Sequence, residues 1–230
     1  MLWLDLSTRQ KMAAECFGTF CLVFAGTGAI VINQISGGTI THPGVALTFG
    51  LVVMAMIYAL GDVSGAHLNP AVTLGLRAAG LFEKKLVLPY LICQLTGAVL
   101  ASLTLRLLFP DSTDLGATQP SGGLMQSTVL EFLLTLILMF TIFAFAKRPG
   151  AASPLAGIVI GGVIALEALF AGPICGASMN PARSLAPAMV AMAPQHLWIY
   201  LAGPLAGALM AVPLSALIQG KPVPTQQLAV

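Results

Sequence analysis

The sequence contains little charge. Asp, Glu, Lys and Arg make up 8% of its 230 residues, whereas hydrophobic residues make up 57%. Soluble domains carry about 25% charged residues, so this composition is typical of a membrane protein. The formal net charge is only +2, and no segment is basic enough to form a phosphate-binding surface, which argues against a nucleic-acid partner.

Motifs for catalysis and metal binding are missing as well. The four cysteines, Cys16, Cys21, Cys93 and Cys175, have spacings that match neither a zinc site nor a disulfide framework. Their positions in or beside apolar segments are typical of small core residues. The sequence contains no evident nucleophile–base pair, metal-ligand cluster or phosphate-binding loop. We therefore expect no enzyme activity, no metal and no cofactor.

Six apolar segments approach the length of about 20 residues that a helix needs to cross a bilayer. They are Met12–Ile32, Val45–Leu60, Leu86–Phe109, Val129–Ala146, Leu155–Pro173 and Leu197–Ile218, of which the second is short. The first is too long for a cleavable signal peptide and is expected to span the membrane. The sequence therefore predicts an all-α membrane protein with six transmembrane helices.

A polar linker divides the six segments into two groups of three. It covers Pro110–Gln126 and is rich in Gly, Ser and Thr. We expect two repeats, over about 10–109 and 127–218, within a single domain that covers 1–230. The tail 219–230 holds two prolines and is expected to be disordered.

Basic residues predict the orientation. Eight of them fall on one side of the membrane under this topology: Arg9, Lys11, Arg77, Lys84, Lys85, Lys147, Arg148 and Lys221. The opposite loops, Asn33–Gly44 and Pro110–Gln126, contain no Lys or Arg. Because basic loops stay on the cytoplasmic side, both termini are expected there. An odd number of spans in each repeat would make the two repeats inverted relative to each other.

A nine-residue motif is duplicated. The segments Gly65–Thr73 (GAHLNPAVT) and Gly176–Ser184 (GASMNPARS) agree at five of nine positions, and their asparagines are 111 residues apart. Asn-Pro-Ala is typical of a helix start, with Asn as the N-cap and Pro at the first helical position. About ten helical residues follow each motif, or roughly 15 Å of helix, which is half the apolar thickness of a bilayer. We therefore predict two re-entrant half-helices.

The two boxes, Asn69-Pro70-Ala71 and Asn180-Pro181-Ala182, would enter from opposite faces and meet at mid-membrane. Their helix N-termini, with free N–H groups and partial positive charge, would point at the same place. The short residues before each asparagine favour an extended strand whose carbonyls face a wet lumen. Each asparagine would offer an NH2 donor to that lumen. A water molecule that turns its oxygen toward both donors would interrupt a proton wire.

With these motifs, the chain resembles the aquaporin, or major intrinsic protein, family over about residues 10–218. The resemblance rests on both boxes, on Ala14–Thr19 in the first span and on Glu131 in the fourth. Within the family, Pro43–Met54 and Gly172–Leu185 are similar to the plant nodulin-like intrinsic proteins and their bacterial relatives. That subgroup carries glycerol, urea and neutral metalloid hydroxides, such as arsenous or boric acid, as well as water. The resemblance implies a channel in the cell (inner) membrane and a homotetramer in which each subunit has its own pore.

Alignment with the family assigns roles to individual residues. Asn69 and Asn180 would be the central pore asparagines, and Glu15 and Glu131 would brace the re-entrant loops from behind. The outer selectivity filter would consist of four residues: Phe49, Ala168, Ala177 and Arg183. Strict water channels of the family carry His at the position of Ala168, so the resemblance implies a wider filter here. Converging helix ends are known to repel cations in aquaporin-type pores.

Three residues keep more than one interpretation. Glu167 either braces the filter loop or Arg183, or it lines the lumen and narrows the pore. His67 is either a structural residue or a pH gate in the cytoplasmic lumen. Cys175 lies near the filter and would make the pore mercury-sensitive if its thiol faced the lumen. Two other functions also stay open: a strict water channel, and an ion- or proton-coupled transporter, because inverted repeats and buried glutamates are transporter features as well.

Overall fold

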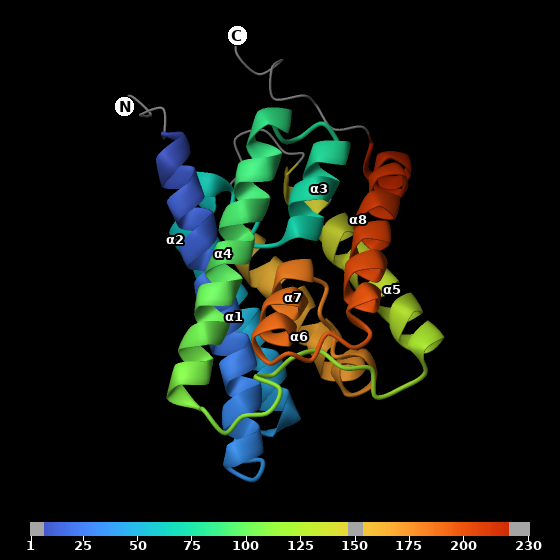
Figure 1. Ribbon diagram of the computed structural model, residues 1–230. Helices are drawn as coiled ribbons and strands as arrows, with labels where there is room; N and C mark the ends of the chain where they lie inside the picture. Colours follow the sequence, from blue (N-terminus) through green and yellow to red (C-terminus); the bar gives the residue numbers. More distant parts are fainter. Residues whose placement is uncertain (1–6, 147–153, 221–230) are drawn as a thin grey trace.

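The computed structural model describes residues 7–146 and 154–220 (Figure 1). Within these ranges the only regular secondary structure is helix, and turns and loops join the helices. The eight helices are α1 (Thr8–Ile35), α2 (Thr41–Ser64), α3 (Pro70–Ala78), α4 (Lys84–Leu108), α5 (Leu124–Ala146), α6 (Ala156–Cys175), α7 (Pro181–Val190) and α8 (Leu197–Gln219). The basic residues Lys147, Arg148 and Lys221 lie outside the described ranges, as does almost all of the predicted disordered tail.

The six long helices correspond to the six predicted spans, and each is long and apolar enough to cross a membrane. The helices are longer than predicted, and in α1, α2, α4 and α5 this is because polar residues at their ends are helical too. Helix α1 starts four residues earlier than expected, since Ser7 and Gln10 form a capping box there. Helix α2 continues through Ser64 and stops at Gly65, which has the left-handed φ of 86° that glycine tolerates.

The two half-helices form as predicted. Helix α3 has 9 residues and α7 has 10, and each begins with proline after an extended asparagine N-cap. In Figure 1 they lie one above the other in the middle of the bundle, framed by the longer helices. Their starting ends meet there, so each half-helix covers only part of the thickness that the long helices cross.

The two halves of the chain repeat the same packing. Helix α1 packs against α4 in the first half, and α5 packs against α8 in the second. Both contacts depend on a glycine: a Cβ on Gly97 would collide with the backbone carbonyl of Cys16, and a Cβ on Gly207 with that of Phe132. Helices α2 and α6 then pack against each other and join the halves.

Polar groups lie inside the bundle and apolar ones outside. Glu15, Glu131 and Arg183 are at most 2% exposed. Large hydrophobic side chains such as Leu88 and Leu107 are exposed on the outer surface. This is the reverse of a soluble protein, and it fits a bundle surrounded by lipid that encloses a polar interior.

We predict that Gly207→Ala destabilises the bundle, because the added methyl must push α8 away from the Phe132 carbonyl of α5. Overpacking of this kind costs about 1–3 kcal/mol. Thermal unfolding in detergent, followed by size-exclusion chromatography, measures the effect.

The matched control is Gly162→Ala on α6, where an added Cβ meets nothing within 4 Å. This variant should be as stable as the parent or slightly more so, because alanine favours helix. Equal stability of the two variants would contradict the close α5–α8 contact.

Candidate functional site

The two Asn-Pro-Ala boxes bind each other in the middle of the molecule. Nδ2 of Asn69 donates to the carbonyl of Met179 at 2.7 Å, and Nδ2 of Asn180 donates to the carbonyl of Leu68 at 2.9 Å. The side-chain oxygen of each asparagine accepts from the first turn of its own half-helix. A carboxamide has two N–H donors. Each asparagine therefore keeps a second N–H besides the one that holds the opposite loop.

The segments before the boxes are not extended strands, so that detail of the prediction is wrong. Ala66 and Leu68 have φ values of 47° and 51°, and Ala177 and Met179 have φ values of 41° and 54°. Left-handed residues alternating in this way turn successive N–H groups to one side and form a concavity for an anion. Such backbone costs about 1–3 kcal/mol per non-glycine residue. Each loop therefore needs a strong partner that holds it.

Glu15 of α1 is the partner of the first loop. Its Oε1 accepts from the backbone N–H of His67 at 2.9 Å and from the Ser64 hydroxyl at 2.7 Å. Its Oε2 accepts from the Leu68 N–H and from the Gln94 side chain, both at 2.8 Å. The carboxylate is fully buried, and hydrogen bonds to an ionised group are about twice as strong as neutral ones. The two backbone bonds fix the loop against α1, and the other two join Glu15 to the end of α2 and to α4.

Glu131 of α5 has the same relation to the second loop. Its Oε1 accepts from the Ser178 N–H at 2.8 Å, and its Oε2 accepts from the Met179 N–H at 2.9 Å. It too is fully buried. The two braces therefore match in their backbone contacts, which come from the two residues just before each box.

A cavity of about 690 Å³ runs past the two Asn-Pro-Ala boxes. Its wall includes both box asparagines and five other residues that the sequence singled out: Phe49, His67, Ala168, Ala177 and Arg183. Much of the remaining wall is apolar, with Leu22, Val53 and Ile160 among its residues. The prolines and alanines of the boxes are buried in the half-helices and are not among the residues that line this cavity. The cavity thus has polar groups on the side of the boxes and a mostly apolar surface elsewhere, where Tyr58 and Asp62 of α2 are the polar exceptions.

Arg183 lies on this wall in the first turn of α7. Its guanidinium carbon is 5.0 Å from the centre of the Phe49 ring, a cation–π distance. One terminal nitrogen donates to the Gly116 carbonyl at 2.9 Å, and Nε has no hydrogen-bond partner in the described part of the chain. The guanidinium is therefore oriented by the protein and lines the cavity, whereas its Nε is buried and does not face the cavity.

Sequence reasoning missed the loop that holds Arg183. Gly116 follows Leu115, and both have left-handed backbone. The Gly116 N–H donates to Oδ1 of Asp114 at 3.0 Å, and Oδ2 of Asp114 accepts from Gln34 of α1 at 3.1 Å. The Asp114-Leu115-Gly116 sequence is a turn signal within the polar linker. It could have predicted the turn but not its contact with α7.

Glu167 does not line the cavity, so the hypothesis that it narrows the pore is wrong for this structure. It is 1% exposed, and neither carboxylate oxygen has a hydrogen-bond partner among the described residues. It therefore makes no bond to the filter loop or to Arg183 either. The reason is helical geometry: one residue turns the side chain by about 100°, so Ala168 faces the cavity and Glu167 points elsewhere.

Cys175 and His67 have different surroundings. The Cys175 thiol is buried, lies 3.5 Å from the Ala171 carbonyl and is absent from the cavity wall, so its thiol does not face the lumen. His67 does line the cavity. Its Nδ1 is 3.1 Å from the Thr73 hydroxyl, and its ring packs against Phe82. These contacts hold the imidazole in the wall beside the first box.

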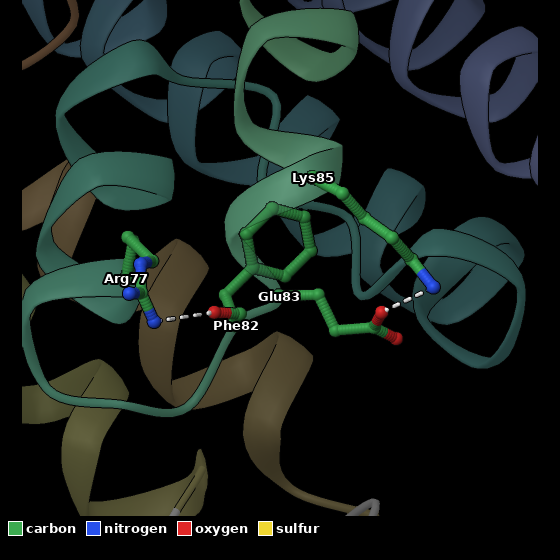
Figure 2. A network of polar contacts seen from close by, with 4 residues as sticks. All are labelled: Arg77, Phe82, Glu83 and Lys85. Atoms are coloured by element: carbon green, nitrogen blue, oxygen red, sulfur yellow. Dashed lines mark hydrogen bonds and ion pairs between the residues drawn. The ribbon is translucent and has the colours of Figure 1, made fainter.

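Figure 2 shows Arg77 on α3 and Lys85 at the start of α4, on either side of the turn that joins these two helices. Arg77 donates to the Phe82 carbonyl at 3.5 Å, and the Lys85 ammonium lies 2.8 Å from the Glu83 carboxylate. The hydrogen bond from Lys85 holds the pKa of Glu83 below its ordinary value. Both members of this pair are exposed, so it contributes little to stability.

Comparison with known proteins gives consistent matches. The family model "Major intrinsic protein" matches residues 3–214. The aquaporin NIP1-1 of Oryza sativa subsp. japonica is 50% identical over 200 residues, which cover 86% of this chain and 70% of the rice protein. The aquaporin NIP1-2 of Arabidopsis thaliana is 44% identical over 216 residues, covering 90% of this chain and 74% of that protein.

A solved structure agrees with this. The X-ray structure of the aquaglyceroporin from Plasmodium falciparum matches with a TM-score of 0.81 and 26% identity, over 92% of this chain and all of that one. The inverted repeat, the paired half-helices and these matches lead to one conclusion: the chain, which is similar to plant aquaporins of the NIP type, belongs to the major intrinsic protein family, the aquaporins.

Proposed function

We propose that this aquaporin-family channel passively conducts water and small uncharged solutes. The solutes are glycerol, urea and neutral metalloid hydroxides such as arsenous or boric acid. The observation that carries the proposal is the set of side chains around Arg183. Phe49 supplies one aromatic wall, Ala168 and Ala177 supply only methyl groups, and all of these line one cavity. A solute with hydroxyls on one side and an apolar back fits such a wall.

The comparisons support the solute range only by similarity. The solved structure that matches is that of an aquaglyceroporin. We extend glycerol conduction to this chain as part of the proposal. A strict water channel is the alternative. It would need a constriction at the level of Arg183, and the small side chains of Ala168 and Ala177 argue against one.

Exclusion of protons and ions is proposed from the middle of the cavity. Asn69 and Asn180 line it, and each has one amide N–H beyond the bond to the opposite loop. The N-termini of α3 and α7 converge at the same level and carry partial positive charge. Water oxygens would therefore orient toward this point, and a cation would meet repulsion there and again at Arg183.

A proton-coupled transporter is the other alternative, and the surroundings of the carboxylates argue against it. Glu15 and Glu131 bond to backbone N–H groups of the loops, and neither lines the cavity. A carboxylate used as a structural acceptor is not free to exchange protons with the lumen. Glu167 has oxygens without a hydrogen-bond partner among residues 7–146 and 154–220, but it too is absent from the cavity wall.

The setting of the channel is also part of the proposal. We propose a single channel domain that forms a homotetramer, each subunit with its own pore, in the cell (inner) membrane with both termini in the cytoplasm. The exposed apolar residues of the long helices support contact with lipid or with neighbouring subunits. The basic residues Arg77, Lys84 and Lys85 at one end support the orientation. Arg106 lies toward the other end, where it donates to the Ser112 carbonyl at 2.6 Å.

The first functional prediction concerns protons. Proteoliposomes with the purified channel should shrink rapidly under an osmotic gradient, while a pH-sensitive dye inside them stays silent under a proton gradient and an imposed voltage. Empty liposomes are the control for leakage. A proton current comparable with the water flux would contradict the proposed barrier at Asn69 and Asn180.

The second prediction compares two substitutions of one brace. Glu131→Gln should keep measurable water flux, because its amide oxygen still accepts from one of the two loop N–H groups. Glu131→Leu leaves both groups without a partner, at a cost of about 1–3 kcal/mol each, and should lower the yield and thermal stability of the folded protein. Size-exclusion chromatography and stopped-flow light scattering measure the two effects. Loss of transport in well-folded Glu131→Gln would support a proton-relay role instead.

The third prediction concerns the filter. Ala168→His adds bulk and a donor beside Arg183, so the permeability to glycerol and arsenous acid should fall several-fold while water flux falls less. Both fluxes are measured on the same vesicles. Ala168→Val adds bulk without a donor and should reproduce much of the effect if it is steric. Equal losses of water and glycerol would mean that residue 168 does not line the constriction.

A further inference from the structure

Helices α2 and α6 carry two of the proposed filter residues, Phe49 and Ala168. The two helices run in opposite directions and touch at Gly50 and Gly161, where a Cβ on Gly50 would lie 2.5 Å from the Gly161 carbonyl oxygen. No side chain fits between them at this point. Above and below this glycine contact, the distance between α2 and α6 therefore depends on the side chains that connect the two helices.

A hydrogen bond to a backbone carbonyl connects the helices on each side of this glycine contact. Toward one end, the hydroxyl of Tyr58 on α2 donates to the Pro154 carbonyl just before α6, at 2.6 Å. Toward the other end, Nε2 of His42 on α2 lies 2.9 Å from the Leu169 carbonyl of α6. The second connection is the one near the proposed filter, because Leu169 directly follows Ala168.

The Leu169 carbonyl is available to His42 because of Pro173. In a regular helix the carbonyl of residue 169 accepts from the N–H of residue 173. Pro173 lies inside α6 and has no N–H. A carbonyl left without its helical partner is an acceptor, and His42 supplies the missing donor. Since a carbonyl only accepts, this bond requires the imidazole proton on Nε2.

Gly172 makes room for this imidazole. A Cβ at position 172 would lie 2.8 Å from Cε1 of His42. The side chain of His42 is thus packed against the backbone of α6 as well as bonded to it. His42 also lies two turns before Phe49 on α2, seven residues away, which puts both on the same face of that helix.

We propose that His42 is a specificity-determining residue that acts by positioning Ala168. By replacing the N–H that Pro173 lacks, it holds the last turns of α6 next to α2 and fixes the width of the filter between Phe49 and Ala168. His42 itself does not line the cavity. The inference rests on the proposed function, because it takes Ala168 to be part of the filter.

The central experiment measures the ratio of glycerol to water permeability in proteoliposomes of His42→Ala. Without the bond, the end of α6 is held to α2 less tightly and the filter discriminates less. We expect the ratio to rise by about two- to tenfold, the range that corresponds to the loss of one hydrogen bond. His42→Gln is the matched control, because its amide Nε2 reaches about as far and still donates, and it should keep most of the parental ratio.

Two further variants separate positioning from a general role in folding. Gly172→Ala should displace the imidazole and raise the ratio as His42→Ala does, although His42 is unchanged. Pro173→Ala restores the N–H that bonds to the Leu169 carbonyl. In the Pro173→Ala background, adding His42→Ala should therefore change the ratio little. Pro173→Ala alone should already raise the ratio, because the Leu169 carbonyl then bonds within α6 and no longer ties this helix to His42 of α2. A merely structural need for the histidine side chain would still appear as a further loss when His42→Ala is added.

The outcomes distinguish this inference from the proposed function. An unchanged or lower ratio in folded His42→Ala, or a loss of water and glycerol flux in equal proportion, overturns the inference. So does a failure of Pro173→Ala to suppress the effect. If Ala168→His alters the ratio while His42→Ala does not, the filter assignment stands and only the role of His42 falls. If neither alters it, the filter assignment itself is wrong.

Discussion

The structure depends on the pair of hydrogen bonds by which each box asparagine holds the opposite loop. Asn69 reaches the Met179 carbonyl, and Asn180 reaches the Leu68 carbonyl. These bonds fix the N-termini of the half-helices against each other. They also settle which way the asparagine amides point, because the oxygens are occupied by the first turns of α3 and α7. The polarity in the middle of the cavity follows from this arrangement.

In both halves the strained backbone lies just before the box, and a buried glutamate stabilises it there. Two left-handed residues precede each box, and a buried carboxylate accepts the N–H groups that this backbone turns inward. The surroundings of the carboxylates differ, however. In the first half, Ser64 and Gln94 also donate to Glu15. The second half carries a further buried carboxyl, Glu167, that has no hydrogen-bond partner in the described ranges. The backbone scaffold is therefore repeated while the polar side chains around it have diverged.

The sequence predicted those parts of the fold that depend on local pattern. Hydropathy predicts the six spans, and Asn-Pro-Ala predicts where α3 and α7 begin, because both signals lie within a few adjacent residues. Contacts over long sequence distances were less accessible. Nothing local in Asp114-Leu115-Gly116 indicates that the Gly116 carbonyl accepts from Arg183. The left-handed backbone of Ala66 and Leu68 was missed for a similar reason, since non-glycine residues adopt it only where tertiary contacts hold it.

Glu167 illustrates the limit of reasoning from neighbours in the sequence. It adjoins Ala168, and proximity along the chain suggested that it shares the lumen. A helix separates adjacent side chains by about 100°, so adjacency argues against a common environment. His42 illustrates the reverse case, because it lies 127 residues from Leu169 and still bonds to its carbonyl. The informative feature was the proline four residues after Leu169, which creates an acceptor whose donor must come from elsewhere.

The reciprocal bonds between the boxes have a consequence for how the chain is made. The acceptor of Asn69 lies in Met179, 110 residues later, so the first half-helix is synthesised long before its partner exists. At a synthesis rate of about 5–20 residues per second, the interval is roughly 5–20 s. During that time the first half-helix can be held only by contacts within its own half, which include the bonds from its loop to Glu15 and the bond from Gln94 to the Thr73 hydroxyl. The bonds from Glu15 to the loop thus help to hold the half of the chain that is synthesised first. The second Asn-Pro-Ala loop then binds to a first loop that is already in place.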